Sequence, residues 1–267
     1  MTVVNIGEIE LDYERSGSGP PLLLIMGMGG TALHWGEPFL NLLRRDFEVI
    51  VYDHRGVGAS SRMEGALSIG ELAADAAGLL TALGIDSAHV MGISMGGMIA
   101  QELTLAHPGL VRTLTLGATS AGGVGSQPPA PAVMERLGEA AMSGSRERAV
   151  RAAWEANVSP RFAADDEAWA RFLAIGERRA VALPVIMAQL RAIIEFDTRS
   201  RLGALALPTL VIHGTLDEII PVANGRTLAE LIPGARLEIF DGAGHLFFLE
   251  APERSAELVC THTAVHV

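Results

Sequence analysis

The amino-acid sequence predicts an α/β fold with a mostly parallel sheet that is covered by helices on both faces. Short, continuously apolar runs bounded by Gly, Pro or Asp are typical of strands that are buried on both faces. We expect such strands at residues 22–25, 49–52, 88–91, 111–116, 209–212 and 236–240. Segments with helical periodicity separate these runs, and an alternation of strands with helices indicates a parallel sheet.

The expected helices have recognisable ends. Ser68 and Glu71 have the spacing of a capping box, which predicts that a helix begins there. Further helices are expected over residues 96–107 and 222–231, because a proline follows the first segment and precedes the second. At the N-terminus, apolar and polar side chains alternate around Gly7, which predicts an antiparallel hairpin.

The alternation of strands and helices breaks between residues 122 and 206. No strand pattern is visible there, a proline-rich linker covers residues 126–131, and the apolar positions beyond it recur at helical spacing. The sequence therefore predicts two parts. Residues 1–121 and 207–267 form an α/β core domain, and residues 122–206 form a helical insertion that packs on the sheet.

The composition narrows the class of protein. Of the 267 residues, 49% are hydrophobic and 19% are charged, as expected of a soluble globular chain. The net charge of −11 argues against nucleic acid or an anionic membrane as a partner, because both attract basic faces. No apolar run approaches the roughly 18–20 residues of a membrane span. The N-terminus carries acids where a signal peptide is apolar, so we expect a cytoplasmic monomer or homodimer.

Cysteine and histidine usage gives no sign of a metal. Cys260 is the single cysteine, which excludes an internal disulfide and a zinc-ribbon cluster, and we expect it to be inert. His262 and His266 are the one histidine pair at a metal-ligand spacing, and we assign them to a frayed C-terminus. No metal or cofactor is therefore expected.

Residues 92–97 read Gly-Ile-Ser-Met-Gly-Gly between an expected strand and an expected helix, which matches the G-x-S-x-G nucleophile elbow. A serine forced into so sharp a turn has a strained backbone, and the glycines of the motif keep the space around the turn almost free of side chains. The turn lifts the Ser94 hydroxyl clear of the sheet. It also places the N–H of Met95 at a helix N-terminus, where it can stabilise an anion. Alone the pattern is weak, because a glycine-rich turn that merely packs tightly also matches it.

A serine hydroxyl becomes a good nucleophile when a base takes its proton and an acid orients the base. Asp217 and His245 lie just after the last two expected strands, and the histidine sits in a glycine-rich loop. Ser94, Asp217 and His245 thus all follow the carboxyl ends of strands, where α/β sheets place their ligands. The three residues are far apart in the chain, so only folding can unite them.

In this combination of motifs, the chain resembles the α/β-hydrolase family from about residue 8 to residue 260. The resemblance rests on four segments, which are residues 53–60, 92–97, 213–217 and 244–245. It implies that Ser94 is the nucleophile, His245 the general base and then acid, and Asp217 the orienting carboxylate. It also implies that residues 122–206 are a cap over the active site. The run over residues 94–101 is similar to the esterase and enol-lactonase branch.

The resemblance also implies an oxyanion hole formed by two backbone N–H groups. One belongs to Met95, and the family takes the other from the loop after the third strand, usually a His-Gly-x sequence. Here that loop reads Met26-Gly-Met28-Gly-Gly, so the N–H of Met28 is assigned as the second donor. Met26 replaces the familiar histidine, which leaves open which groups support the loop.

Other interpretations of these motifs are weaker. Residues 27–32 also read G-x-G-x-x-A after a strand, and Asp53 ends the next strand, which imitates a dinucleotide-binding fingerprint. That interpretation leaves the serine, the acid and the histidine unexplained. Glu218 is an alternative to Asp217 as the orienting acid, and His213 is expected to be structural.

Together these observations predict a serine hydrolase that cleaves a carboxylic ester or lactone through an acyl-enzyme intermediate. Its expected partner is a small, largely apolar substrate, and Trp154, Trp169 and Phe172 are candidates for lining the pocket. A C–C bond hydrolase or an acyl-homoserine lactonase would use the same three residues. A small-molecule receptor would keep the fold with negligible turnover, and fold class does not choose among these functions.

Overall fold

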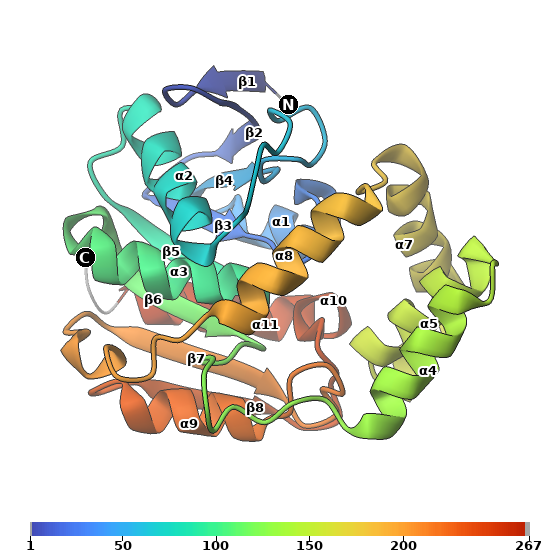
Figure 1. Cartoon of the computed structure of the whole chain (residues 1–267). Coiled ribbons are helices and arrows are strands. Elements are labelled where there is room, and N and C mark those ends of the chain that lie inside the picture. The colour runs from blue at the N-terminus through green and yellow to red at the C-terminus, as the bar shows by residue number, and fades with distance from the viewer. Residues whose placement is uncertain (1, 265–267) are drawn as a thin grey trace.

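The computed structural model describes residues 2–264, and within them the strands form one eight-stranded sheet (Figure 1). The strand order is β1-β2-β4-β3-β5-β6-β7-β8, and β2 runs antiparallel to both of its neighbours while the remaining pairs are parallel. The strands are β1 (Thr2–Asn5), β2 (Glu10–Gly17), β3 (Pro21–Ile25), β4 (Glu48–Tyr52), β5 (Ala88–Ile93), β6 (Val111–Gly117), β7 (Thr209–Gly214) and β8 (Arg236–Phe240). The predicted strands and the N-terminal hairpin are therefore confirmed.

Helices cover both faces of the sheet, as the alternating pattern predicted. The helices are α1 (Glu37–Leu43), α2 (Ile69–Ala82), α3 (Met95–Ala106), α4 (Pro131–Met142), α5 (Arg146–Asn157), α6 (Pro160–Ala163), α7 (Asp166–Arg178), α8 (Leu183–Glu195), α9 (Ala223–Leu231), α10 (Phe247–Glu250) and α11 (Pro252–Ala264), with 3₁₀ helices η1 (Ala32–Trp35), η2 (Pro108–Leu110) and η3 (Leu202–Ala204). The predicted capping box is present, since the Ser68 hydroxyl accepts from the Glu71 N–H and the Glu71 carboxylate accepts from the Ser68 N–H.

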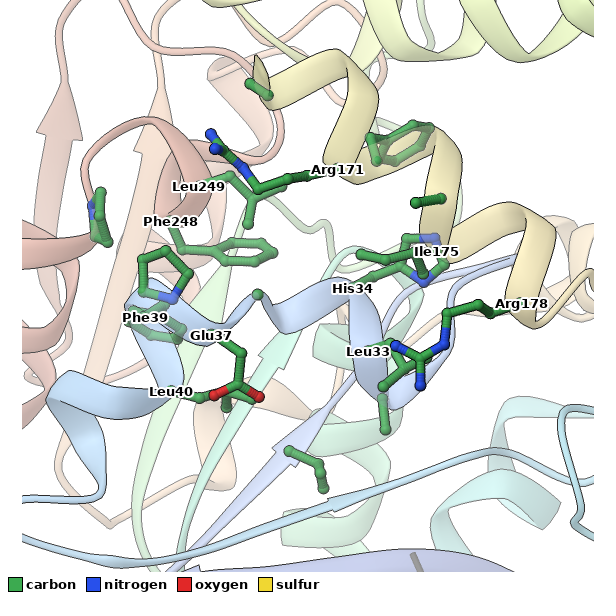
Figure 2. A pocket seen from close by; sticks show the side chains of 18 of the residues that line it. Leu33, His34, Glu37, Phe39, Leu40, Arg171, Ile175, Arg178, Phe248 and Leu249 are labelled. Carbon is green, nitrogen blue, oxygen red and sulfur yellow. The ribbon is translucent and has the colours of Figure 1, made fainter.

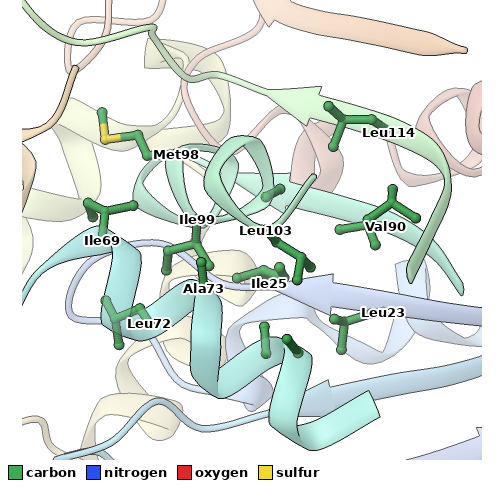
Figure 3. Close-up of a cluster of buried hydrophobic side chains, with 14 of the residues drawn as sticks. Leu23, Ile25, Ile69, Leu72, Ala73, Val90, Met98, Ile99, Leu103 and Leu114 are labelled. Carbon is green, nitrogen blue, oxygen red and sulfur yellow. The ribbon is translucent and has the colours of Figure 1, made fainter. Parts of the chain in front are cut away.

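The side chains of β3 alternate between two hydrophobic cores. Leu23 and Ile25 pack with α2 and α3 on one face, which Figure 3 shows, and Leu22 and Leu24 pack with α1, α10 and α11 on the other. A strand that is buried on both faces has no polar face, which is why it reads as a continuous apolar run. Burying each such side chain stabilises the fold by about 1.5–3 kcal/mol. These cores hold the carboxyl ends of the central strands in place.

The segment between β6 and β7 is helical, from α4 to α8 (Figure 1). The apolar spacing of the sequence predicted α5, α7 and α8, whereas α4 and the short α6 carried no clear pattern. An aromatic cluster packs α5, α6 and α7 together, with Trp154 and Phe172 at a ring-centroid distance of 4.9 Å. Leu246, next to His245 in the core, also packs against this cluster.

Arg179, at the end of α7, joins the insertion to the core. Its guanidinium contacts two buried carboxylates, those of Asp12 on β2 and Asp53 just after β4. The second carboxylate oxygen of Asp53 accepts the N–H of Ala32 at 2.7 Å. The guanidinium of Arg179 thus offsets the cost of removing the Asp12 and Asp53 carboxylates from water, although it lies 167 and 126 residues along the chain from them.

Helix α11 includes His262, so the expectation that this residue belongs to a frayed end is wrong. His262 lies in α11, is buried, and its Nε2 is 3.2 Å from the carbonyl oxygen of Leu114 on β6. His266 lies outside the described residues. Over residues 2–264, no helix is both long and apolar enough to cross a membrane.

Replacing Arg179 by Met should destabilise the fold, because it leaves the carboxylates of Asp12 and Asp53 buried without their cation. Removing one partner of a buried ion pair costs about 3–5 kcal/mol, and we expect a loss near the lower end because this guanidinium is partly exposed. Urea unfolding measures the loss. Arg191→Met removes an exposed pair with Glu195 and should leave the urea midpoint unchanged. Equal midpoints for the two variants would show that Arg179 is not a structural link.

Candidate active site

Ser94 sits in the turn between β5 and α3 with φ 57° and ψ −123°. Positive φ is rare for a residue with a side chain and costs about 1–3 kcal/mol, so the surrounding structure must hold it there. The N–H of Ser94 donates to the carbonyl of Gly117 at 2.9 Å, and the hydroxyl of Thr119 donates to the carbonyl of Ser94 at 2.7 Å. The predicted strand-to-helix elbow is therefore present, and strand β6 supports it.

Two glycines of the elbow are required by close backbone contacts. A Cβ added at Gly92 would lie 2.1 Å from the carbonyl oxygen of Gly96, and one added at Gly96 would lie 2.0 Å from the carbonyl oxygen of Ile25. Any side chain at either position would push α3 away from β5 or β3. The sequence pattern around Ser94 thus reflects how tightly the turn packs.

Asp217, in the loop after β7, is a buried carboxylate with several donors. Its Oδ1 accepts the N–H groups of Ile219 at 2.9 Å and Ile220 at 2.8 Å, and its Oδ2 lies 2.8 Å from His245 Nδ1 and 3.1 Å from His213 Nε2. Burial by itself raises the pKa of the carboxyl, but attraction to His245 and hydrogen bonds from both imidazoles outweigh it and lower the pKa to about 2. The group is thus ionised at neutral pH.

His245 follows β8, and the hydrogen bond to Asp217 fixes its tautomer. Because a carboxylate only accepts, Nδ1 carries the hydrogen, which leaves Nε2 of a neutral ring as an acceptor. The structure therefore brings together the predicted acid and base. Glu218 instead pairs with Arg136, so it does not take the place of Asp217.

Ser94 does not complete a hydrogen-bonded chain with that pair. Among residues 2–264, no hydrogen bond joins the Ser94 hydroxyl to another side chain or to the backbone. Hydrogen bonds of this kind are often long in ligand-free sites and tighten when substrate binds.

His213, expected to be structural, contacts the acid directly. Its Nε2 lies 2.7 Å from the carbonyl oxygen of Ile220 as well as 3.1 Å from Asp217, and both of these groups accept, so Nε2 carries the hydrogen. The ring is fully buried and packs on Gly225, where a Cβ would come within 2.5 Å of Nδ1. Sequence reasoning found this histidine but not its contact with the carboxylate.

The loop after β3 approaches the serine. A Cβ added at Gly27 would lie 3.0 Å from the Ser94 Cβ, so this loop borders the hydroxyl. Among the described residues, neither the N–H of Met28 nor that of Met95 has a hydrogen-bond partner. Both predicted oxyanion donors therefore lack a protein acceptor within residues 2–264, one in the loop and one at the N-terminus of α3.

Two side chains from elsewhere support this loop in place of the familiar histidine. His54 Nε2 lies 2.9 Å from the carbonyl oxygen of Met26, and burial lowers the pKa of this imidazole, so a neutral ring donates the hydrogen. Gln189 on α8 accepts the N–H of Gly29 through Oε1 at 2.9 Å. The Nε2 of Gln189 is buried and has no partner in the described structure. No sequence pattern predicts this role of Gln189, because its partner lies 160 residues away.

The remaining sequence candidates have other contacts. Both oxygens of Asp53 are engaged by Ala32 and Arg179, so this carboxylate is not free to bind a ribose as the dinucleotide interpretation requires. The three pocket candidates, Trp154, Trp169 and Phe172, pack in the aromatic cluster of the insertion, and Trp154 and Phe172 also line a cavity between α7 and the core. Within the described residues, no cluster of three metal-ligating side chains is present.

Known proteins resemble this chain over nearly its whole length. A family model described as the alpha/beta hydrolase fold matches residues 20–252. RutD of Azorhizobium caulinodans, a candidate carbamate hydrolase, is 35% identical over 263 residues, which cover 97% of each chain. An esterase from Thermogutta terrifontis has a TM-score of 0.81 at 28% identity, covering 100% of this chain and 99% of its own. The enol-lactonase of Burkholderia xenovorans LB400 has a TM-score of 0.83 at 25% identity, covering 98% and 100%.

Replacing Gln189 by Leu should speed amide exchange at Gly29, because the N–H loses its acceptor. One net hydrogen bond is worth about 1 kcal/mol, so we expect exchange to accelerate by roughly five- to tenfold. Hydrogen–deuterium exchange of the peptide that covers residues 26–32 measures the effect. Arg191→Leu, on the exposed side of the same helix, is the control and should change nothing. Unaltered protection in Gln189→Leu would mean that α8 does not support the loop.

The low pKa of Asp217 should appear in the pH dependence of stability. Its folded pKa of about 2 lies below the ordinary value of 3.8, so the stabilisation is present above pH 4 and is lost as the pH falls toward 2. The difference in unfolding free energy between the wild type and Asp217→Asn should therefore shrink by about 2 kcal/mol over that interval. Urea unfolding at a series of pH values measures it, and a constant difference would contradict the assignment.

Proposed function

Because the chain belongs to the α/β-hydrolase family, we propose that it is a serine hydrolase that cleaves a carboxylic ester or lactone through an acyl-enzyme. The observation that carries the proposal is the strained backbone of Ser94 between two backbone donors. One donor is the N–H of Met28 in the facing loop, and the other is the N–H of Met95 at the start of α3. Neither N–H has a hydrogen-bond partner within the described residues. A backbone N–H without an acceptor destabilises the folded protein, and it stabilises an oxyanion when one forms beside it.

In the proposed acylation, the Ser94 oxygen attacks the carbonyl carbon of the substrate while His245 Nε2 takes the hydroxyl proton. The negative charge on the carbonyl oxygen is held by the N–H groups of Met28 and Met95. The tetrahedral intermediate then expels the alcohol oxygen, which receives the proton from His245. In a lactone the alcohol stays attached to the acyl group.

Deacylation repeats these steps with water. His245 takes a proton from the water, whose oxygen attacks the acyl carbon, and the Ser94 oxygen leaves with the proton that His245 returns. Asp217 stays ionised throughout and stabilises the imidazolium. The hydrogen bond from His213 keeps the carboxylate from rotating away from His245.

A second candidate reaction is carbamate hydrolysis, which the 35% identity to RutD over nearly the whole of both chains favours. The same serine would attack the carbamate carbonyl, and the leaving nitrogen would take the proton from His245. C–C bond cleavage, acyl-homoserine lactone hydrolysis and a receptor role use the same fold, and substrate panels separate them.

Replacing Ser94 by Ala should reduce ester hydrolysis by at least about a thousandfold, because the loss of a triad member leaves only the oxyanion donors and binding. Initial rates with short-chain nitrophenyl esters measure the loss. Ser126→Ala changes a serine whose hydroxyl donates to Gly122 in the loop after β6, and it should retain activity. Near-normal hydrolysis by Ser94→Ala would refute the assignment.

The substrate class is decided by kcat/KM for matched esters, γ- and δ-lactones and an N-aryl carbamate, whose C–N cleavage releases an aniline. The proposal expects esters or lactones to exceed the carbamate, with a graded preference of about 1–3 kcal/mol per methylene in an apolar pocket. A higher kcat/KM for the carbamate would establish the second candidate. Ligand binding without turnover of any of these compounds would indicate a receptor.

A further inference from the structure

A cavity of about 350 Å³ lies between α7 of the insertion and the η1–α1 segment of the core (Figure 2). Most of its wall is apolar. The wall includes Leu33, Phe39, Phe172, Ile175, Phe248 and Leu249. Its volume is at the lower end of the range for small-molecule sites. Ser94, Met28 and His245 are not among the lining residues, so the cavity is separate from the candidate active site.

His34 supplies a hydrogen-bond donor in this wall. Its Nδ1 accepts the N–H of Thr31 at 3.0 Å, and the ring contacts Phe172 edge-on at a centroid distance of 5.6 Å. Burial lowers the pKa of His34 to about 4, so the ring is neutral at pH 7. With Nδ1 as the acceptor, Nε2 carries the hydrogen, and it has no protein partner among the described residues.

Some charged side chains at the rim of the cavity have an ion-pair partner, and others do not. Arg44 already pairs with Glu37 at 2.6 Å and with Glu14 at 3.1 Å, so these acids are occupied. Arg178, near the end of α7, pairs with no carboxylate in the described part of the chain. In Figure 2 its guanidinium extends from α7 toward Leu33, on the same side of the cavity as His34. One end of the cavity is therefore cationic and donor-rich.

The opposite end is lined by aromatic and aliphatic side chains, and the cation on that side, Arg171, pairs with Glu167 at 3.5 Å. Figure 2 shows Phe39, Phe248 and Leu249 together on the far side from Arg178. Phe39 and Phe248 contact each other at a ring-centroid distance of 5.6 Å. A ligand that satisfies both ends has an apolar body and one anionic group.

We propose that this cavity is a second binding site, which takes a monocarboxylate with an apolar chain of medium length. The carboxylate meets Arg178 and the Nε2–H of His34, and the chain lies on Phe39 and Phe248. Because the walls come from both α7 and the core, the bound ligand clamps the insertion to the core. The site is independent of any chemistry at Ser94.

Octanoate is the test probe, and isothermal titration calorimetry with the full-length Ser94→Ala protein measures its binding. We expect one site per chain, and at least tenfold weaker binding of octanol, which has the same chain without the charge. Arg178→Glu should weaken octanoate binding at least tenfold, whereas Arg191→Glu on the exposed face of α8 should not. Equal binding of octanol and octanoate would overturn the carboxylate assignment.

The location is tested by filling the cavity. Ala174 lines it from an exposed position on α7, so Ala174→Trp should fold normally and abolish octanoate binding. Wild-type protein whose serine has reacted with a phosphonate should still bind octanoate with unchanged affinity. Loss of binding after phosphonate treatment would place octanoate in the active site and overturn the proposal. If the phosphonate does not react, the proposed hydrolase function is contradicted. The second binding site is then tested by Ala174→Trp alone, and unchanged octanoate binding by that variant would overturn it.

Discussion

The ionised carboxylate of Asp217 is the interaction on which the arrangement at the sheet edge depends. Taking a carboxylate out of water costs several kcal/mol, and two backbone N–H groups and two imidazoles offset that cost. These donors come from β7, the loop that follows it and the loop after β8. One buried charge therefore fixes the relative position of both loops and the tautomer of His245, before any ligand is present.

The strain at Ser94 is tolerated because of the sheet beneath it. The central strands have side chains in both hydrophobic cores, so β5 cannot shift to relax the turn without disturbing packing on two faces. The carbonyl of Gly117 and the hydroxyl of Thr119 hold the turn from β6 and the loop after it. A rigid sheet thus holds a strained serine after β5 and a fixed imidazole after β8. Neither residue depends on a mobile segment for its position.

Features whose cause is local could be predicted from the sequence, whereas contacts between distant segments could not. The apolar runs, the capping box at Ser68 and the glycines around Ser94 each reflect constraints within a few residues. Gln189 and Arg179 meet partners 160 and 126 residues away, and their contacts depend on how the insertion docks. Helix α11 was missed because polar residues interrupt its apolar face, which also hid the burial of His262.

These long-range contacts give the insertion influence over the chemistry of the core. Gln189 holds the loop that carries the Met28 donor, and Arg179 fixes the end of the preceding helix to Asp12 and Asp53. A displacement of α8 would withdraw the acceptor from Gly29 and so shift the loop that carries the N–H of Met28, the proposed oxyanion donor. Relatives that share the sheet differ in the substrates that their names describe. Selectivity is therefore expected to follow the packing of residues 122–206, because the elbow and the acid–imidazole pair are fixed by the sheet.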